Sequence, residues 1–245
     1  MRIAVAGGTG LVGSRTVAAL GEAGHEAVVL ARSRGTDLTT GAGLDAALVG
    51  VEAVIDVTNV ATLRGSRATA FFEAAGGHLS AAAARAGVRH LVTLSIVGVD
   101  RVPLGYYQGK LRQEQLALRG PVPATVLRSA QFHEFAEQFL AGAAPVALVP
   151  RMLVQPVAAA EVAAALARLA AGLALGRAPD LAGPQPEQLV DMVRRLRDAR
   201  GMRRRVVGLW APVPALRLAS GGALLPQHPG PRGQQSYAEW LTRDA

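Results

Sequence analysis

The first 130 residues of the chain alternate between short apolar runs and longer alanine-rich stretches with helical spacing. The apolar runs contain few polar residues, which is typical of strands buried on both faces of a parallel sheet. They cover Ile3–Ala6, Ala27–Ala31, Ala53–Val57, Leu91–Leu94 and Ala124–Leu127. Strands that alternate with helices are joined by crossover connections, so the pattern predicts an α/β fold with a doubly wound parallel sheet.

The stretches between these runs predict helices, and each ends near a glycine, a residue that favours a helix C-terminus. The predicted helices are Leu11–Ala23, Leu44–Val49, Arg67–Ala86 and Tyr107–Arg119, and the glycines are Gly24, Gly50, Gly87 and Gly120.

From about residue 131 the alternation loosens. The pattern there predicts a short apolar run between Pro145 and Pro150, helices over Ala158–Ala171 and Glu187–Ala199, a strand over Arg205–Trp210, and a Pro- and Gly-rich tail with a helix near Tyr237–Leu241. No linker or internal repeat is visible. We expect one Rossmann domain over residues 1–245, in which residues from about 131 onward form the substrate-side region.

Composition excludes several classes of function. The 245 residues include no cysteine, which excludes disulfides and zinc–thiolate sites, and the five scattered histidines lack a metal-binding spacing. No apolar run is long enough to span a membrane, and we expect a cytoplasmic protein. The net charge of +8 owes much to an arginine cluster over residues 194–205. We interpret this cluster as a solvated helix face and expect no nucleic-acid partner, because no recognition module accompanies it.

A glycine motif follows the first predicted strand and opens the first predicted helix. It reads Gly7-Gly8-Thr9-Gly10-Leu11-Val12-Gly13. At such a position glycines permit a tight turn and close backbone approach, while the helix N-terminus presents N–H groups to a pyrophosphate. The motif predicts a dinucleotide-binding site.

The end of the second predicted strand indicates which dinucleotide is bound. An NAD-binding fold places an acidic residue there, but this chain has Arg32 and Ser33 and no carboxylate nearby. Arg32 can contact a 2′-phosphate through two N–H groups, and Ser33 can add a hydroxyl. We therefore predict NADP(H) in preference to NAD(H). Asp37, followed by Leu38, is predicted to accept from the adenine amino group, and Asn59 follows the third strand, where it should line the same crevice.

A tyrosine stands four residues before the only lysine of the chain, in Tyr106-Tyr107-Gln108-Gly109-Lys110. Tyr106 and Lys110 should therefore share one helical face. The ammonium can lower the phenol pKa and hold the nicotinamide ribose, while Tyr106 donates its proton to a developing alkoxide. Ser95 ends the fourth predicted strand and can hydrogen-bond the same oxygen. The alternative is that the two tyrosines pack a helix start and Lys110 only binds ribose.

Taken together, these residues resemble the short-chain dehydrogenase/reductase superfamily, and more closely its atypical branch of NmrA-like NAD(P)-binding proteins and related NAD(P)H-dependent reductases. The likeness covers nearly the whole chain and includes the glycine motif, Arg32, Asp37-Leu38, Leu94-Ser95-Ile96-Val97-Gly98, Tyr106-Tyr107-Gln108-Gly109-Lys110-Leu111 and Leu127-Arg128-Ser129-Ala130-Gln131-Phe132. It implies a Rossmann fold with a small C-terminal substrate region, and catalytic roles for Ser95, Tyr106 and Lys110.

The glycine pattern departs from the Thr-Gly-x-x-x-Gly-x-Gly of the commoner short-chain reductases and agrees with atypical and extended members. Some atypical members lack the catalytic tyrosine, and some sense the cofactor without turnover. Gln131, Phe132 and His133 follow the predicted strand that ends at Arg128, where the resembled family begins its substrate pocket, and we predict that they bind substrate. His133 could bind or protonate substrate, or it could be an ordinary polar residue on a helix. We predict an NADPH-dependent reductase of a hydrophobic carbonyl, enone or quinone, acting as a monomer or homodimer. A redox sensor, and an isomerase or epimerase that uses the cofactor transiently, remain as alternatives.

Overall fold

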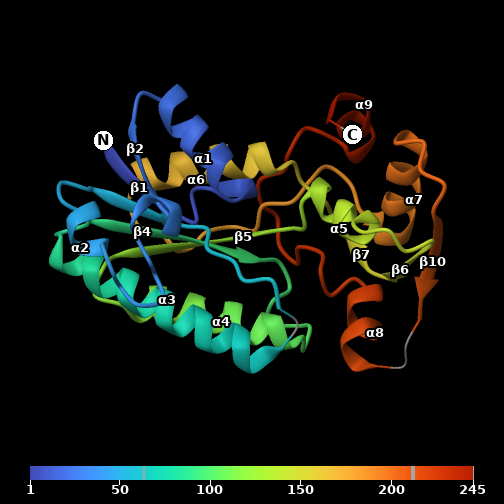
Figure 1. Ribbon diagram of the computed structural model, residues 1–245, viewed down its shortest axis with the longest axis horizontal. Coiled ribbons are helices and arrows are strands. Elements are labelled where there is room, and N and C mark those ends of the chain that lie inside the picture. Colours follow the sequence, from blue (N-terminus) through green and yellow to red (C-terminus); the bar gives the residue numbers. More distant parts are fainter. Residues whose placement is uncertain (63, 211–212, 245) are drawn as a thin grey trace. The chain divides into compact units, whose positions relative to one another are not determined.

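The computed structural model describes residues 1–62, 64–210 and 213–244 (Figure 1). The chain divides into two compact units, each assembled from three separate segments. Unit 1 comprises Met1–Ser95, Leu104–Arg128 and Ala160–Ala178, and unit 2 comprises Ile96–Pro103, Ser129–Ala159 and Pro179–Ala245.

Unit 1 is built around a six-stranded sheet in the order β2-β1-β3-β4-β5-β8. Its strands are β1 (Arg2–Ala6), β2 (Glu26–Leu30), β3 (Ala53–Asp56), β4 (His90–Ile96), β5 (Ala124–Ser129) and β8 (Gly176–Arg177). The pairs β1–β2, β1–β3, β3–β4 and β5–β8 are parallel, and their register places Val29, Val5, Ile55 and Val92 side by side across the sheet. This is the doubly wound parallel sheet that the alternating pattern predicted.

Helices cover both faces of this sheet, α1 and α6 on one face and α3 and α4 on the other (Figure 1). The helices of unit 1 are α1 (Leu11–Glu22), α2 (Leu44–Ala47), α3 (Gly65–Arg85), α4 (Gly105–Arg119) and α6 (Ala159–Ala171, whose first residue belongs to unit 2). A hydrophobic core that includes Leu30, Leu48, Val54 and Leu79 lies between helices and strands, each of these side chains almost completely buried. Because both faces of the strands are covered, their apolar runs are nearly continuous.

Close packing of α3 on α4 depends on small residues. A Cβ added at Gly109 would lie 2.7 Å from the Ala68 backbone carbonyl carbon and 2.9 Å from the Phe72 ring. A glycine at this position therefore lets the two helix backbones approach, and it brings the Phe72 ring against the face of α4 that carries Tyr106 and Lys110.

Unit 2 consists of short elements. They are the 3-10 turn η2 (His133–Ala136), α5 (Glu137–Leu140), β6 (Val146–Pro150), β7 (Leu153–Val154), β9 (Glu187–Gln188), α7 (Leu189–Ala199), β10 (Arg205–Leu209), α8 (Pro214–Ser220) and α9 (Tyr237–Asp244). β10 and β6 form a parallel pair, and β7 and β9 form an antiparallel pair. No described helix is both long and apolar enough to cross a membrane.

The structure adds a helix to the Pro- and Gly-rich tail predicted before residue 237. This helix, α8, begins at Pro214, where the fixed φ of proline suits the first helical turn. Gly24, Gly50 and Gly87 adopt the left-handed conformation expected after a helix, but Gly120 is extended, with φ −71°.

Candidate functional site

The glycine motif forms a tight turn between β1 and α1. Gly7 is left-handed, with φ 80°, and its N–H donates to the carbonyl of Leu30 at 3.1 Å, so the turn is attached to the end of β2. A Cβ at Gly13 would lie 2.1 Å from the Gly7 carbonyl oxygen, whereas a Cβ at Gly10 would meet that same oxygen only at 3.4 Å. Gly7 and Gly13 are therefore positions at which the turn requires glycine, and a Cβ at Gly8 would also lie only 3.0 Å from the Val5 carbonyl oxygen.

The N-terminus of α1 has backbone N–H groups that are not used by hydrogen bonds within the helix. The first intrahelical hydrogen bond is donated by Ser14 to Gly10, and the Gly10 cap contributes no side chain. The N–H groups of Leu11, Val12 and Gly13 precede that bond and have no partner within the helix. Such a set of donors, at the positive end of a helix, fits an anionic phosphate group.

Arg32 and Ser33 lie in η1 (Arg32–Arg34), a 3-10 turn directly after β2. Both side chains are exposed, as the predicted contact with a 2′-phosphate requires. Asp37 is half-buried, and its Oδ1 accepts from the Thr39 N–H at 2.8 Å and the Thr39 hydroxyl at 2.7 Å. These bonds, with the charge of Arg32 as a minor cause, hold the pKa of Asp37 below its usual value. Leu38 is partly buried and packs against the hydrophobic core of unit 1.

Tyr106 and Asn59 come together at the carboxyl ends of the strands. Tyr106, in the first turn of α4, donates from its hydroxyl to Asn59 Oδ1 at 2.7 Å, and this bond lies at the exposed surface. Burial of the ring, with Tyr107 beside it, raises the pKa of the Tyr106 phenol well above its usual value. Tyr106 is therefore a protonated phenol at neutral pH, in the state required of a proton donor.

Lys110 lies one helical turn further along α4, but its ammonium is buried, with only 4% of the residue exposed. Nζ donates to the carbonyl of Leu94 at 2.7 Å and to Gln113 Oε1 at 2.6 Å, and it lies 4.9 Å from the centre of the Phe72 ring. Burial lowers the pKa of Lys110 to about 8, against the opposing effect of Asp56 and Glu114. Two of the three N–H donors of Nζ thus bind oxygen acceptors among the described residues.

Three buried side chains form a hydrogen-bonded group that ends at Lys110, and none of them was predicted from the sequence: Asp56, Thr58 and Gln113. Asp56 ends β3 and is 3% exposed. Its Oδ1 accepts from the Thr58 N–H at 3.0 Å and the Thr58 hydroxyl at 2.7 Å, and its Oδ2 accepts from Gln113 Nε2 at 2.7 Å. A charged residue within the apolar run of β3 was the available signal, because a buried carboxylate must find partners.

Ser95 lies near the end of β4 and is 1% exposed. Its Oγ has no hydrogen-bond partner among the residues that the structure describes, and the same holds for Thr93 Oγ1 on the same strand. A buried hydroxyl without a partner is costly, which fits a partner that the chain itself does not supply. Gly7, Asn59 and Ser95 follow or end β1, β3 and β4, so they share one edge of the parallel sheet.

The three residues predicted to bind substrate belong to unit 2. Gln131 is buried and Phe132 half-buried, and both lie where the chain pairs with Val157. His133 is completely buried, and its Nε2 lies 3.0 Å from the Gln235 carbonyl oxygen. Its ring packs against Tyr237 and Trp240 of α9. This is the environment of a core histidine, and substrate binding by these three residues stays a prediction.

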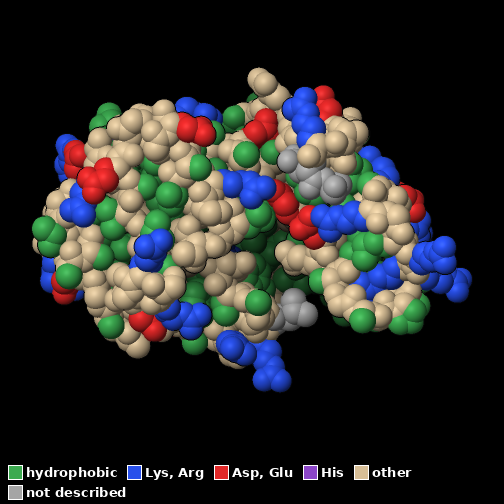
Figure 2. Space-filling model, turned by 45° about the horizontal axis from the view of Figure 1, so that its top comes forward, with side chains coloured by type: hydrophobic (Ala, Val, Ile, Leu, Met, Phe, Trp, Pro, Cys, Tyr) green, Lys and Arg blue, Asp and Glu red, His purple; other side chains and the backbone are tan. Residues whose placement is uncertain are grey.

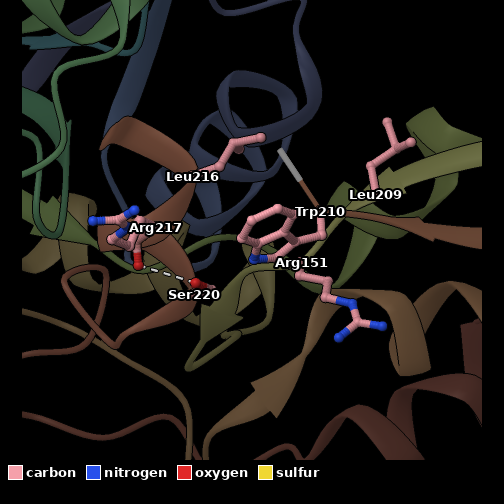
Figure 3. A pocket seen from close by; sticks show the side chains of 6 residues that line it. All are labelled: Arg151, Leu209, Trp210, Leu216, Arg217 and Ser220. Carbon is pink, nitrogen blue, oxygen red and sulfur yellow. Dashed lines mark hydrogen bonds between the residues drawn. The ribbon is translucent and has the colours of Figure 1, made fainter. Parts of the chain in front are cut away.

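Other candidate sites on the described chain are weak. A small hollow in unit 2 is lined by Leu209, Trp210, Leu216 and Ser220, together with Arg151 and Arg217 (Figure 3). The two guanidinium groups point in different directions, so they do not converge on a common ligand. No group of three or more metal-ligating side chains occurs within residues 1–62, 64–210 and 213–244.

A curated relative covers part of the chain. A (4-alkanoyl-5-oxo-2,5-dihydrofuran-3-yl)methyl phosphate reductase from Streptomyces griseus is 34% identical over 144 residues, which correspond to 53% of this chain and 48% of the relative. The chain thus spans about half the length of the curated relative that it matches. No protein-family model matches the sequence.

Solved structures resemble the chain over nearly its full length. MoeE5 in complex with UDP-glucose and NAD covers 99% of this chain and 96% of its own, with a TM-score of 0.75 and 18% identity. An NADPH-dependent quinone oxidoreductase from Escherichia coli, complexed with NADPH, covers 98% of both chains, with a TM-score of 0.72 and 21% identity. At such identities the likeness establishes the fold. The chain has a Rossmann-like α/β fold with a doubly wound parallel sheet, as its alternating apolar pattern predicted.

Proposed function

We propose that this protein is an NAD(P)H-dependent oxidoreductase that reduces a hydrophobic carbonyl, enone or quinone-like substrate. The observation that carries the proposal is the hydrogen bond from the half-buried Tyr106 to Asn59 at the carboxyl ends of the strands, one helical turn before the only lysine of the sequence. The glycine turn between β1 and α1 supports it, since its geometry fits a pyrophosphate. The curated relative is a reductase whose named substrate contains a conjugated ketone, in line with the proposed class.

The residues present fit a dinucleotide, and each has an assigned task. The turn at Gly7–Gly13 and the first N–H groups of α1 hold the pyrophosphate, and Arg32 with Ser33 holds the 2′-phosphate of NADP(H), which we favour over NAD(H). Asp37 and Leu38 are assigned to the adenine side, and Asn59 to the crevice wall. When bound, the reduced nicotinamide supplies the hydride.

Tyr106 is the proposed proton donor. As negative charge develops on the substrate oxygen, Tyr106 releases its bond to Asn59 and donates to that oxygen, while Ser95 donates a second hydrogen bond from its unpartnered hydroxyl. Lys110 lies one helical turn from Tyr106 on α4, and its positive charge is assigned the role of opposing the effect of burial on the phenol, so that the phenolic proton can be lost. On the substrate side, Gln131, Phe132 and His133 remain assigned to the pocket as part of the proposal.

A screen for NADPH oxidation over quinones, enones, aromatic ketones and an acylated butenolide phosphate tests this function. With a substrate found, Tyr106→Phe is expected to lower kcat by about 100-fold or more while NADPH affinity is retained, because only the proton donor is lost. Tyr107→Phe is the matched control, since it removes a hydroxyl at the adjacent position of α4. Equal loss in the two variants would contradict the role of Tyr106.

A cofactor sensor without turnover is the second candidate. It is favoured by the burial of Lys110, whose ammonium is already engaged by Leu94, Gln113 and Phe72. A sensor would bind NADPH, oxidise it with none of the substrates in the screen, and respond to Tyr106→Phe with no change in cofactor affinity. An epimerase or isomerase that uses the cofactor transiently is a third alternative, and because it consumes no NADPH it is tested by incubating the protein and oxidised cofactor with a UDP-sugar and separating the sugar epimers.

A further inference from the structure

A continuous chain of buried hydrogen bonds connects the end of β3 to the end of β4 by way of α4. It runs from the Thr58 hydroxyl to Asp56, from Asp56 to Gln113, from Gln113 to Lys110, and from Lys110 to the Leu94 carbonyl. Each bond measures 2.6–2.7 Å. Every side chain in it is at least nine-tenths buried.

The amide of Gln113 has only one orientation that satisfies both neighbours. Its Nε2 donates to Asp56 Oδ2, and its Oε1 accepts from Lys110 Nζ. The reversed amide would bring an NH2 group against an ammonium and a carbonyl oxygen against a carboxylate. Gln113 therefore links a buried anion to a buried cation, and its dipole is aligned with both.

Asp56 is the carboxylate that is linked to Lys110, through the Gln113 side chain. The neighbouring Glu114, which is fully buried, is bound by Arg128 through two bonds of 2.8 Å and by Arg177 at 3.1 Å, so two cations already offset its charge. Among the described residues Asp56 has no direct ion pair. The α3 side of Lys110 contributes the uncharged ring of Phe72, and α4 itself contributes the phenol of Tyr106, one turn away.

We propose that Asp56 and Gln113 are positioning residues that hold the Lys110 ammonium charged and in place one helical turn from Tyr106, with the Gln113 amide transmitting the effect of the carboxylate. The part of this inference that concerns catalysis rests on the proposed function, whereas the effect on Lys110 itself does not. Burial alone disfavours the charged ammonium, and Asp56 opposes that effect. Without the carboxylate, or without the amide between them, Lys110 would lose its proton more readily.

The single lysine makes a direct measurement possible. Full-length protein labelled with ¹³Cε,¹⁵Nζ-lysine gives one side-chain signal, whose pH titration reports the ionisation of Lys110 without cofactor or substrate. Gln113→Met removes the bonds to Lys110 and Asp56, together with a longer one of 3.2 Å to the Thr58 hydroxyl, and Asp56→Asn removes the charge. Each is expected to weaken proton binding by Lys110 about tenfold. Gln113→Glu places a carboxylate directly against Nζ and is therefore expected to strengthen proton binding by Lys110.

The double variant D56N/Q113E is the decisive test. It moves the negative charge from residue 56 to residue 113 and restores the donor–acceptor order, because the new amide at position 56 can donate to the new carboxylate at position 113, which can in turn accept from Lys110. We expect Lys110 in the double variant to bind its proton at least as tightly as in the unmodified protein. Gln115→Met, an exposed position on the same helix, is the control and should leave the titration unchanged.

Gln113→Met and Gln113→Glu are expected to shift the Lys110 titration in opposite directions. A general loss of structure would shift it in the same direction in both variants, so the two explanations can be distinguished. Titrations that coincide in all variants would overturn it. With an active substrate, the pH dependence of kcat should move with the Lys110 titration while KM for NADPH changes little. If the Lys110 titration shifts in a variant and the pH dependence of kcat does not, the proposed effect of Asp56 and Gln113 on catalysis is wrong. A chain without turnover, but with the expected lysine shifts, would refute the proposed function and retain the link between Asp56 and Lys110.

Discussion

At the scale of single residues, Lys110 is a cation held where burial opposes its charge. Arginine could not take its place at low cost, because a planar guanidinium is larger, presents its donors in a fixed fork and does not lose its proton in proteins. The compact ammonium fits between a strand carbonyl, an amide oxygen and an aromatic ring. This environment explains why a chain that otherwise uses arginine for its long basic side chains retains one lysine here.

The lowered pKa of Lys110 predicts how stability depends on pH. Its pKa falls from the usual 10.5 to about 8 in the folded state, so between these values the unfolded chain binds more protons. The free energy of unfolding should therefore rise from pH 8 to about pH 10, by at most about 3 kcal/mol. Above that range the raised pKa values of Tyr106 and Tyr237 act in the opposite direction.

Urea denaturation at a series of pH values measures this rise, and Lys110→Met should lack it. The comparison is made between the two slopes with pH, because the substitution also leaves Gln113 Oε1 and the Leu94 carbonyl without a donor. Parallel slopes for the two proteins would mean that Lys110 ionises normally when folded.

Arg32 carries the prediction on cofactor choice. Arg32→Glu replaces a donor to the 2′-phosphate by a carboxylate that repels it and can accept from a 2′-hydroxyl, so NADPH affinity should fall roughly 10- to 100-fold while NADH affinity is retained. Calorimetric titration measures both affinities. Arg34→Glu makes the same charge change at the end of the same 3-10 turn and should have a smaller effect. Equal affinity of the unmodified protein for NADPH and NADH would contradict the assignment.

At the scale of elements, the contact between α3 and α4 is sensitive to volume. Gly109→Ala would bring a methyl group to 2.7 Å from the backbone of Ala68, so one helix must move. We expect a loss of about 1–3 kcal/mol in the free energy of unfolding, measured by urea denaturation. Gly77→Ala in the interior of α3 is the control. A Cβ there meets nothing within 4 Å, so better helix propensity should stabilise the protein by up to about 1 kcal/mol.

The strands and the longer helices were predictable from sequence because each repeats a simple apolar pattern. β1, β3 and β5 begin within one residue of the predicted runs, and the glycine turn lies where its spacing placed it. α8 was missed because proline and glycine mask a short helix whose first residue is itself a proline.

The candidate site was predictable only in part. Tyr106, Lys110 and Ser95 were visible as sequence signals, whereas the link of Gln113 to Asp56 depends on pairing residues 57 positions apart. The burial of His133 beneath α9 also depends on contacts across more than a hundred residues. Neither follows from local spacing.

At the scale of the whole molecule, the positive charge is dispersed. Within the arginine cluster of α7 and the residues after it, Arg194, Arg195, Arg197 and Arg200 each pair with a carboxylate. On the face drawn in Figure 2, Lys and Arg side chains are spread in several small groups among apolar and acidic ones. Such a surface attracts polyanions weakly and without sequence preference.

We accordingly expect only non-specific binding to nucleic acid. Duplex DNA should bind with a Kd on the order of 10⁻⁵ M or weaker at physiological salt and lose most of that affinity as salt rises, because the attraction depends on released counterions. Fluorescence anisotropy of a labelled random duplex measures both quantities. A Kd below about 10⁻⁷ M that resists added salt would contradict the expectation of no nucleic-acid partner.

Because Lys110 is buried, its chemical reactivity can also be used to measure how often this region of the protein opens. An acylating reagent needs a free, uncharged amine, and the Lys110 Nζ meets solvent only when α4 separates from the strand ends. The rate of mass gain at residue 110 would then count openings of this region directly, and occupancy by a dinucleotide should slow it.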